Sequence, residues 1–269
     1  MEISAMKNKE LIMKNYKKEC KGLFLACGLW LMACSSFASE VKEPNVAGQF
    51  YPSNKEELKG VILRYIDQAK QEAVEGSPVL LISPHAGYVY SGPVAAYGYA
   101  GLKGKKVDTV IILAASHFFP FKGISVYKEG IFKTPLGDIT IDSEFASRLI
   151  KENTGLISDN RKVFEQEHSL EVQLPFLQVS LEPGFKIVPV IFGEADYADC
   201  VLFSKYLEKM ARGKNVLVIA STDLSHYRTY DEALYFDKKT IESIRNFEEA
   251  RIQGHRLQVL SRTHSIRKN

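Results

Sequence analysis

Four short segments of the chain consist almost entirely of apolar residues. These segments are 78–83, 109–114, 186–192 and 215–220. Continuous apolar runs of this length are typical of strands that are covered on both faces, as in parallel sheets. We therefore predict that the four segments form a buried, mostly parallel central sheet.

Longer segments with helical spacing lie between the predicted strands. A first helix is expected after Ser53 or Asn54, because two acids follow in its first turn and apolar residues then recur every three or four positions. Further helices are predicted at 92–102, 143–153, 168–180, 196–212 and 231–247. This alternation predicts an α/β fold with helices on both faces of the sheet.

Two segments between the second and third predicted strands show a different pattern. Residues 123–127 and 137–142 alternate between apolar and polar positions and flank turn-forming residues. Alternation is typical of strands with one solvated face. We predict that these two segments pair as a β-hairpin extension.

The N-terminal region has the pattern of an export signal. Lysines between Lys14 and Lys21 precede the apolar run 22–33, which is shorter than a membrane-spanning helix needs. The run ends in Leu31-Met-Ala-Cys34, which is similar to a bacterial lipobox, whereas Ser36-Phe-Ala38 is similar to an ordinary cleavage site. We favour lipidation of Cys34, and hence an exported protein that is periplasmic or anchored as a lipoprotein facing the periplasm.

The net charge comes from this region. The whole chain has 35 basic and 32 acidic residues, a net charge of +3, and its first 33 residues contain six lysines and three glutamates. The remainder is therefore neutral and shows no basic stripe, so we expect no nucleic-acid partner. Cys200 is the one cysteine after Cys34, which excludes an internal disulfide in the exported domain.

Side chains that can bind a metal ion follow three of the four predicted strands. His85 follows the first strand, His117 the second, and Asp223 and His226 the fourth. Ligands in open α/β sheets bind beyond the carboxyl ends of the strands, so these side chains are expected to converge. A single histidine in such a position is more often structural, but several together indicate a site for zinc, iron or copper.

A fourth histidine lies near the start of a predicted helix. His168 and Glu171 are three residues apart, as in carboxylate-bridged iron bundles, but no second Glu-x-x-His is present. We therefore exclude a di-iron bundle. His168 either points into the crevice or belongs to a helix cap with solvated acids, and the residues alone leave both interpretations open.

Seven stretches together resemble the Memo-like family, whose bacterial members are often called AmmeMemoRadiSam system protein B. The stretches are Val46-Ala-Gly-Gln-Phe-Tyr-Pro52, Ser83-Pro-His-Ala-Gly-Tyr-Val-Tyr-Ser-Gly92, Ala115-Ser-His117, Thr134-Pro-Leu-Gly-Asp138, Glu167-His-Ser-Leu-Glu-Val-Gln-Leu-Pro175, Ile187-Val-Pro-Val190 and Ser221-Thr-Asp-Leu-Ser-His226. The resemblance implies the fold of class III extradiol dioxygenases. Those enzymes open catechol rings with oxygen and with iron(II) held by two histidines and a carboxylate.

The resemblance also implies roles for individual residues. The corresponding pocket of Memo-like proteins holds two histidines and a cysteine, and His85 and His117 match the two histidines. Asp223 and His226 match pocket residues that would orient groups or shuttle protons, and His168 matches a histidine that would support the substrate. The expected cofactor is iron or copper, with zinc as an alternative.

The C-terminal segment departs from the family pattern. Residues 248–269 form a basic tail without a cysteine, where family members carry a Cys-Gly-x-x-Pro-like segment. We therefore expect a signal peptide and linker at 1–38, a Memo-like α/β domain at 44–247 and a divergent tail, with the C-terminal part of the family domain missing. The third metal ligand would then be absent and a sheet edge exposed.

Three functions follow as hypotheses. The first is a metal-binding protein with a dioxygenase-like or redox pocket, a non-haem iron or copper oxidoreductase. The second is a non-catalytic module that binds a small molecule or peptide. The third is a hydrolase that uses a metal-activated water. The sequence leaves all three open.

Overall fold

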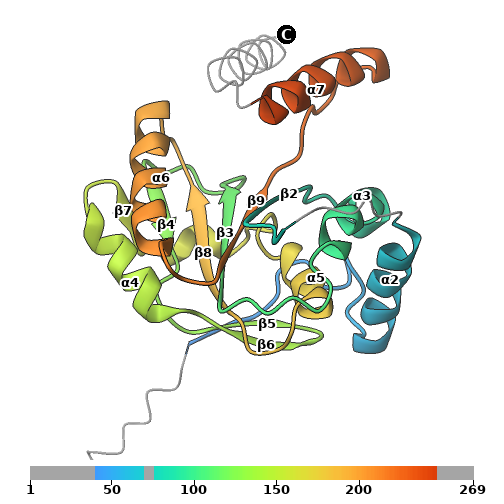
Figure 1. Cartoon of the computed structure of the whole chain (residues 1–269), viewed down its shortest axis with the longest axis horizontal. Coiled ribbons are helices and arrows are strands. Elements are labelled where there is room, and N and C mark those ends of the chain that lie inside the picture. Colours follow the sequence, from blue (N-terminus) through green and yellow to red (C-terminus); the bar gives the residue numbers. More distant parts are fainter. Residues whose placement is uncertain (1–39, 70–75, 247–269) are drawn as a thin grey trace, which may run out of the picture. The chain divides into compact units, whose positions relative to one another are not determined.

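The computed structural model describes residues 40–69 and 76–246, in which strands and helices alternate (Figure 1). The helices are α2 (Lys55–Gln68), α3 (Tyr88–Ala100), α4 (Ser143–Glu152), α5 (Gln173–Ser180), α6 (Tyr197–Ala211) and α7 (Tyr230–Arg245), with a 3-10 helix at Arg161–Phe164. The strands are β1 (Val41–Lys42), β2 (Leu80–Ser83), β3 (Thr109–Ala115), β4 (Ile124–Val126), β5 (Ile131–Thr134), β6 (Gly137–Thr140), β7 (Ile157–Ser158), β8 (Lys186–Phe192) and β9 (Val216–Ser221).

The central sheet has six strands in the order β2-β9-β3-β8-β4-β7. Strands β2, β9, β3 and β8 are parallel to one another, while β4 is antiparallel to β8. The four parallel strands are the four apolar segments of the sequence, which confirms the predicted sheet. β3 and β8 are buried along nearly their whole length, as strands covered on both faces must be.

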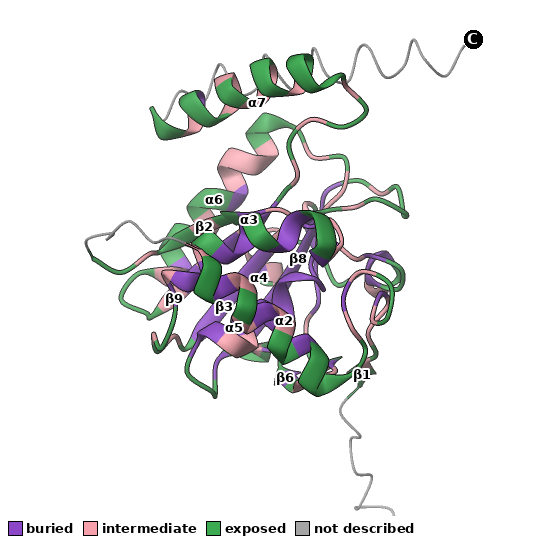
Figure 2. Ribbon diagram, turned by 90° about the vertical axis from the view of Figure 1, so that its right-hand side faces the viewer, coloured by how far each residue is buried: buried purple, intermediate pink, exposed green. Residues whose placement is uncertain are grey.

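Helices cover both faces of this sheet (Figure 1). α2, α3 and α5 pack together on one face, and α4 packs against α6 on the other. α3 lies close to β2 because residue 98 is a glycine: a Cβ there would be 2.3 Å from Leu81 Cδ1. Figure 2 shows the buried residues concentrated along the strands between the two helical layers.

The β-hairpin is present, but its strands differ from the prediction. Residues 124–126 form β4 in the central sheet, and residues 137–140 pair instead with β5 at 131–134. All three residues of β4 are buried, which suits a sheet interior and not a hairpin with a solvated face. β5 and β6 are joined by the two-residue link Pro135-Leu136, and β1 adds a parallel strand to β5.

α5 begins at Gln173 and not at residue 168 as predicted. The side chain of Glu167 accepts hydrogen bonds from the backbone N–H groups of His168 and Ser169. These bonds hold the chain in a turn ahead of the helix, because they compete with helical backbone pairing. The difference matters for the site, since this turn carries His168.

Within the described ranges, no helix combines the length and the apolar character that crossing a bilayer requires. The predicted signal peptide and linker (1–38), including Cys34, and the basic tail (248–269) lie outside the described residues. The predictions for these segments therefore remain predictions.

Gly193, directly after β8, gives a test of how the loop beyond β3 is held. Backbone hydrogen bonds join Gly193 and Glu194 to the loop at Phe121 and Gly123. A Cβ at position 193 would lie 2.2 Å from the carbonyl oxygen of Phe121. We expect Gly193→Ala to lower the free energy of unfolding by about 1–3 kcal/mol, measured by urea denaturation.

Gly60→Ala is the matched control. Gly60 lies inside α2, and nothing is within 4 Å of a Cβ placed there. Alanine favours a helix interior over glycine, so this variant should gain about 0.5–1 kcal/mol. Equal effects of the two substitutions would contradict the packing described here.

Candidate metal centre

The metal-capable side chains follow the carboxyl ends of β2, β3 and β9. These strands are neighbours in the sheet and parallel, so their carboxyl ends meet at one edge. His85 follows β2, His117 follows β3, and Asp223 and His226 follow β9. The convergence that the sequence predicts is therefore present in the fold.

Three imidazoles form the centre of the site. Each of His85, His117 and His168 offers a ring nitrogen, and these three nitrogens lie within 4.8 Å of one another. The exposed fractions of the side chains are 5% for His85, 13% for His168 and 35% for His117. The group is thus buried on one side and open to ligands at His117.

The ring of His117 is fixed by Glu167. Nδ1 of His117 lies 2.9 Å from Oε1 of Glu167, and the backbone N–H of His117 donates to Oε2 at 2.7 Å. An ionised carboxylate only accepts hydrogen bonds, so Nδ1 of His117 carries the proton. Nε2 is left with a lone pair, which is the arrangement found in carboxylate–histidine–metal sites.

The ring of His85 is fixed by Ser221, the last residue of β9. The hydroxyl of Ser221 donates to the carbonyl oxygen of Ser169 at 2.5 Å. Since that hydroxyl has one proton, it accepts at its other contacts, including Nδ1 of His85 at 3.2 Å. His85 therefore also carries its proton on Nδ1 and keeps a lone pair on Nε2.

Gln173, at the start of α5, keeps Ser221 in this role. Its Nε2 donates to Ser221 Oγ at 2.8 Å and to the carbonyl oxygen of Pro84 at 3.0 Å. A carbonyl accepts only, so the contact with Pro84 sets which end of the Gln173 amide is the nitrogen. The hydroxyl of Tyr99 donates to the amide oxygen at 2.7 Å, which completes the network.

His168 differs because one of its nitrogens lacks a hydrogen bond. Nδ1 of His168 is buried and makes no hydrogen bond within the described part of the chain, although it lies 3.5 Å from Oε1 of Glu167. Buried polar atoms nearly always have a partner, so such an atom indicates an interaction with a group from outside the chain. The ring is held in place by Phe50 and Phe118, at centroid distances of 4.9 and 5.7 Å. An imidazole nitrogen in this position fits a metal ligand.

The contact with Phe50 explains one of the N-terminal motifs. Glu171 accepts hydrogen bonds from Asn45 N, Val46 N and the hydroxyl of Tyr51. This carboxylate holds the loop that contains Phe50 against the turn that carries His168. Glu171 thus supports the site through this loop and does not belong to the three-histidine group.

The pKa shifts favour neutral imidazoles at two of the three positions. Burial lowers the pKa of His85 to about 4, and the neighbouring histidines act in the same direction against the opposing charge of Asp223. Burial also lowers the pKa of His168. Neutral imidazole is the form that binds metal ions, so both rings are ready to bind one at neutral pH.

His117 and Glu167 shift in the opposite sense because they are partners. The hydrogen bond to Glu167 raises the pKa of His117. Burial alone would raise the pKa of Glu167, but hydrogen bonds from His117 and Ser169 outweigh it and lower that pKa to about 2. Glu167 therefore stays ionised and keeps the proton of His117 on Nδ1.

Asp223 and His226 lie at the rim of the group. Oδ1 of Asp223 accepts the backbone N–H of His85 at 2.7 Å, and Oδ2 lies 3.8 Å from His85 Nε2 and 3.7 Å from His226 Nε2. The side chain of His226 is 53% exposed. Asp223 thus stands between a buried imidazole and one that reaches solvent, and neither residue belongs to the three-histidine group.

Comparison with known proteins shows the family of the chain. The sequence pattern of the Memo-like protein family matches residues 42–262. The chain belongs to the Memo-like family. It is 39% identical to a MEMO1 family protein of Desulfurococcus amylolyticus over 214 residues, which cover 76% of this chain and 75% of the relative. It is 37% identical to one from Methanopyrus kandleri, over 78% and 77%, and 36% identical to one from Nitrosopumilus maritimus, over 76% and 75%.

In this Memo-like chain, the structure locates His168 and adds residues that support the ligands. His168, expected to support a substrate, lies beside the two expected ligands. The roles of Glu167, Ser221 and Gln173 depend on contacts between distant segments, and only the position of Glu167 next to His168 offered a signal. Cys200 lies in α6, outside the three-histidine group.

Glu167→Gln tests the role of the buried carboxylate. A neutral amide would present a donor to groups that themselves donate, so we expect a loss of about 3 kcal/mol in the free energy of unfolding at pH 7. The pKa of Glu167 is lowered by folding from 4.5 to about 2, so its contribution is complete above pH 4.5 and is lost as the pH falls toward 2. In the variant, the free energy of unfolding should therefore not show the loss that Glu167 causes between pH 4.5 and pH 2, measured by urea unfolding at each pH.

Glu165→Gln is the control for this prediction. Glu165 lies two residues earlier and is exposed, and its side chain makes no hydrogen bond or ion pair with another described residue. It should change stability by less than about 0.5 kcal/mol at any pH. A Glu167→Gln variant that behaves like this control would contradict the assigned role.

Proposed function

We propose that this Memo-like chain binds a transition-metal ion on His85, His117 and His168 and acts as a dioxygenase-like oxidoreductase on a small organic substrate. The observation that carries the proposal is the convergence of three ring nitrogens within 4.8 Å. In two of the rings, Nδ1 is hydrogen-bonded and Nε2 keeps the lone pair that can bind a metal. The third ring has a buried nitrogen without a hydrogen bond.

The donor set narrows the choice of metal. Imidazole nitrogen suits iron, copper and zinc, whereas calcium and magnesium prefer oxygen ligands. Iron or copper bound here would supply redox chemistry with oxygen, as the resemblance to extradiol dioxygenases suggests. The contributions of the chain are then to bind the ion, to fix the two Nδ1–H tautomers and to present a substrate surface.

The surroundings of the site support a small aromatic substrate and proton transfer. Phe118 is 56% exposed and lies edge-on to His168, so it offers an apolar contact for a flat ring. The carboxylate of Asp223, next to His85, can accept a proton from a bound hydroxyl group. His226, 3.7 Å away and open to water, can pass that proton to solvent.

Metal analysis with single substitutions tests the ligand set. Wild type should bind one equivalent of iron(II) or copper, and His85→Ala, His117→Ala and His168→Ala should each weaken binding by more than about 100-fold, since even residues that only support ligands cost 10- to 100-fold. His226→Ala is the matched control and should keep its metal. Equal metal content in all five proteins, or none in wild type, would refute the site.

The same preparations distinguish the candidate reactions. Oxygen consumption with catechols by iron- or copper-loaded protein would support the oxidoreductase. A set of three imidazoles without a carboxylate also favours zinc, which would supply an activated water for hydrolysis. Cleavage of p-nitrophenyl acetate by zinc-loaded protein alone would therefore support a hydrolase. Metal binding without either activity would support a non-catalytic binding module.

We also propose that the protein is exported and anchored to a membrane through a lipid on Cys34. The support is the basic segment, the short apolar run and the lipobox-like sequence before Cys34. In a bacterial host, Cys34→Ser should move the protein from the membrane fraction to the soluble fraction and remove the mass of the acyl chains. Cys27→Ser, inside the apolar run, should change neither. Membrane association that persists in Cys34→Ser would refute the anchor.

A further inference from the structure

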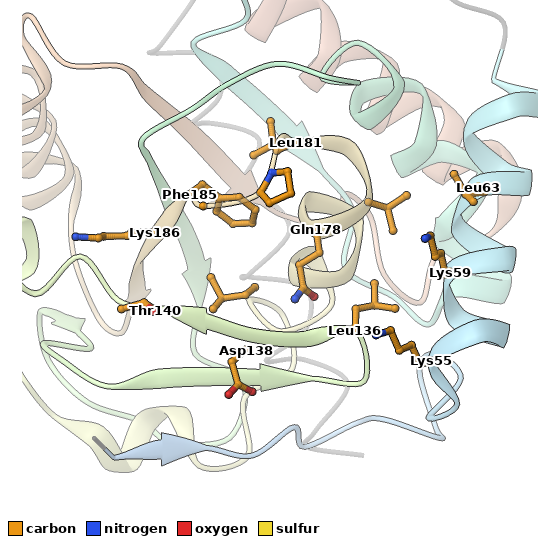
Figure 3. A pocket seen from close by; sticks show the side chains of 14 residues that line it. Lys55, Lys59, Leu63, Leu136, Asp138, Thr140, Gln178, Leu181, Phe185 and Lys186 are labelled. Carbon is orange, nitrogen blue, oxygen red and sulfur yellow. The ribbon is translucent and has the colours of Figure 1, made fainter. Parts of the chain in front are cut away.

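A second cavity lies at the opposite edge of the sheet from the metal centre. It has a volume of about 680 Å³ and lies between α2, α5 and the β5–β6 hairpin (Figure 3). Lys186, the first residue of β8, lines it, whereas the metal centre follows the carboxyl ends of the strands. None of the residues of the metal centre lines this cavity, so the two sites are separate.

The cavity has a fixed wall. Thr134 Oγ1 donates to Oε1 of Gln178 at 2.6 Å, and Nε2 of Gln178 donates to the carbonyl oxygen of Gly137 at 3.1 Å. These bonds join α5 to the turn of the hairpin. Ligand sites in proteins are mostly preformed in this way, and a volume of 300–1,000 Å³ is typical of them.

Much of the lining is apolar. Ile139, Leu181 and Phe185 are buried, and Leu136 and Val179 are half-buried beside them. Figure 3 shows Leu181 and Phe185 on one side of Gln178 and Leu136 on the other. An elongated hydrocarbon group would find contacts along this surface.

Three lysines add positive charge to the cavity. Lys55 and Lys59 come from α2 at one end and Lys186 lies at the other end (Figure 3). The side chain of none of the three makes an ion pair or hydrogen bond with another described residue, and Asp138 is the one acid of the lining. Lys55 and Lys59 are four residues apart on one helix, where like charges repel each other by about 0.2–0.5 kcal/mol. A bound anion would offset this repulsion.

We propose that this cavity binds an organic carboxylate with an apolar body. The carboxylate lies between Lys55 and Lys59, and the apolar body extends over Ile139, Leu181 and Phe185 toward Lys186. The lining contains no arginine, so the anionic group is held by lysine point charges and not by a bidentate guanidinium. The site is independent of the metal and of the reaction at the three histidines.

Titration calorimetry with decanoate tests this proposal on the metal-free or metal-loaded protein. Wild type should bind one decanoate per chain, with weaker binding of decan-1-ol, which lacks the charge, and of acetate, which lacks the apolar body. Lys55→Met/Lys59→Met should weaken decanoate binding about tenfold, because two rim charges are lost. Lys55→Arg/Lys59→Arg keeps the charge and should retain most of the affinity.

Lys151→Met/Lys205→Met is the matched control. Both lysines are exposed, lie on α4 and α6, and do not line the cavity. This variant loses the same charge and should bind decanoate like wild type. The proposal is overturned if decanoate does not bind, if both methionine variants lose affinity equally, or if decan-1-ol binds as tightly as decanoate.

Discussion

The buried carboxylate of Glu167 is the interaction on which the metal centre depends. Five donors meet it: the backbone N–H groups of His117, His168 and Ser169, the ring Nδ1–H of His117 and the hydroxyl of Ser169. A buried charge without such partners would be strongly unfavourable. The five hydrogen bonds compensate for the burial of the charge. Through them, the side chain of Glu167 orients the ring of His117 and shapes the turn that carries His168.

The sheet supplies the corresponding constraint for His85. β9 lies between β2 and β3, so Ser221 at its end is next to Ser83 at the end of β2. From there the hydroxyl of Ser221 reaches the ring of His85, and Gln173 fixes the direction of its proton. The imidazoles are thus held by groups from the strand ends and from the turn before α5.

Much of the fold can be predicted from the sequence because the signals are local. The four parallel strands are continuous apolar runs, and burial on both faces demands such runs. The hairpin prediction was wrong in its pairing, because the alternation of residues 123–127 does not reveal that Ile124–Val126 joins the central sheet. Strand pairing depends on contacts between distant segments, which a local pattern does not specify.

The candidate metal centre likewise has features that local signals predict and features that depend on distant contacts. The positions of His85, His117, Asp223 and His226 after strand ends predict their convergence, whereas the network of Glu167, Ser221 and Gln173 joins residues far apart in the sequence. The expectation of an incomplete site rested on a cysteine as the third ligand. The structure places His168 beside the other two histidines, so three protein donors are available within the described residues.

The central claim is that the metal ligands are three imidazoles. X-ray absorption spectroscopy at the edge of the bound metal measures the first-shell donors directly. We expect nitrogen or oxygen scattering alone, with the outer-shell features of three imidazole rings in wild type and of two in His168→Ala. A sulfur shell, or a spectrum unchanged by His168→Ala, would contradict it.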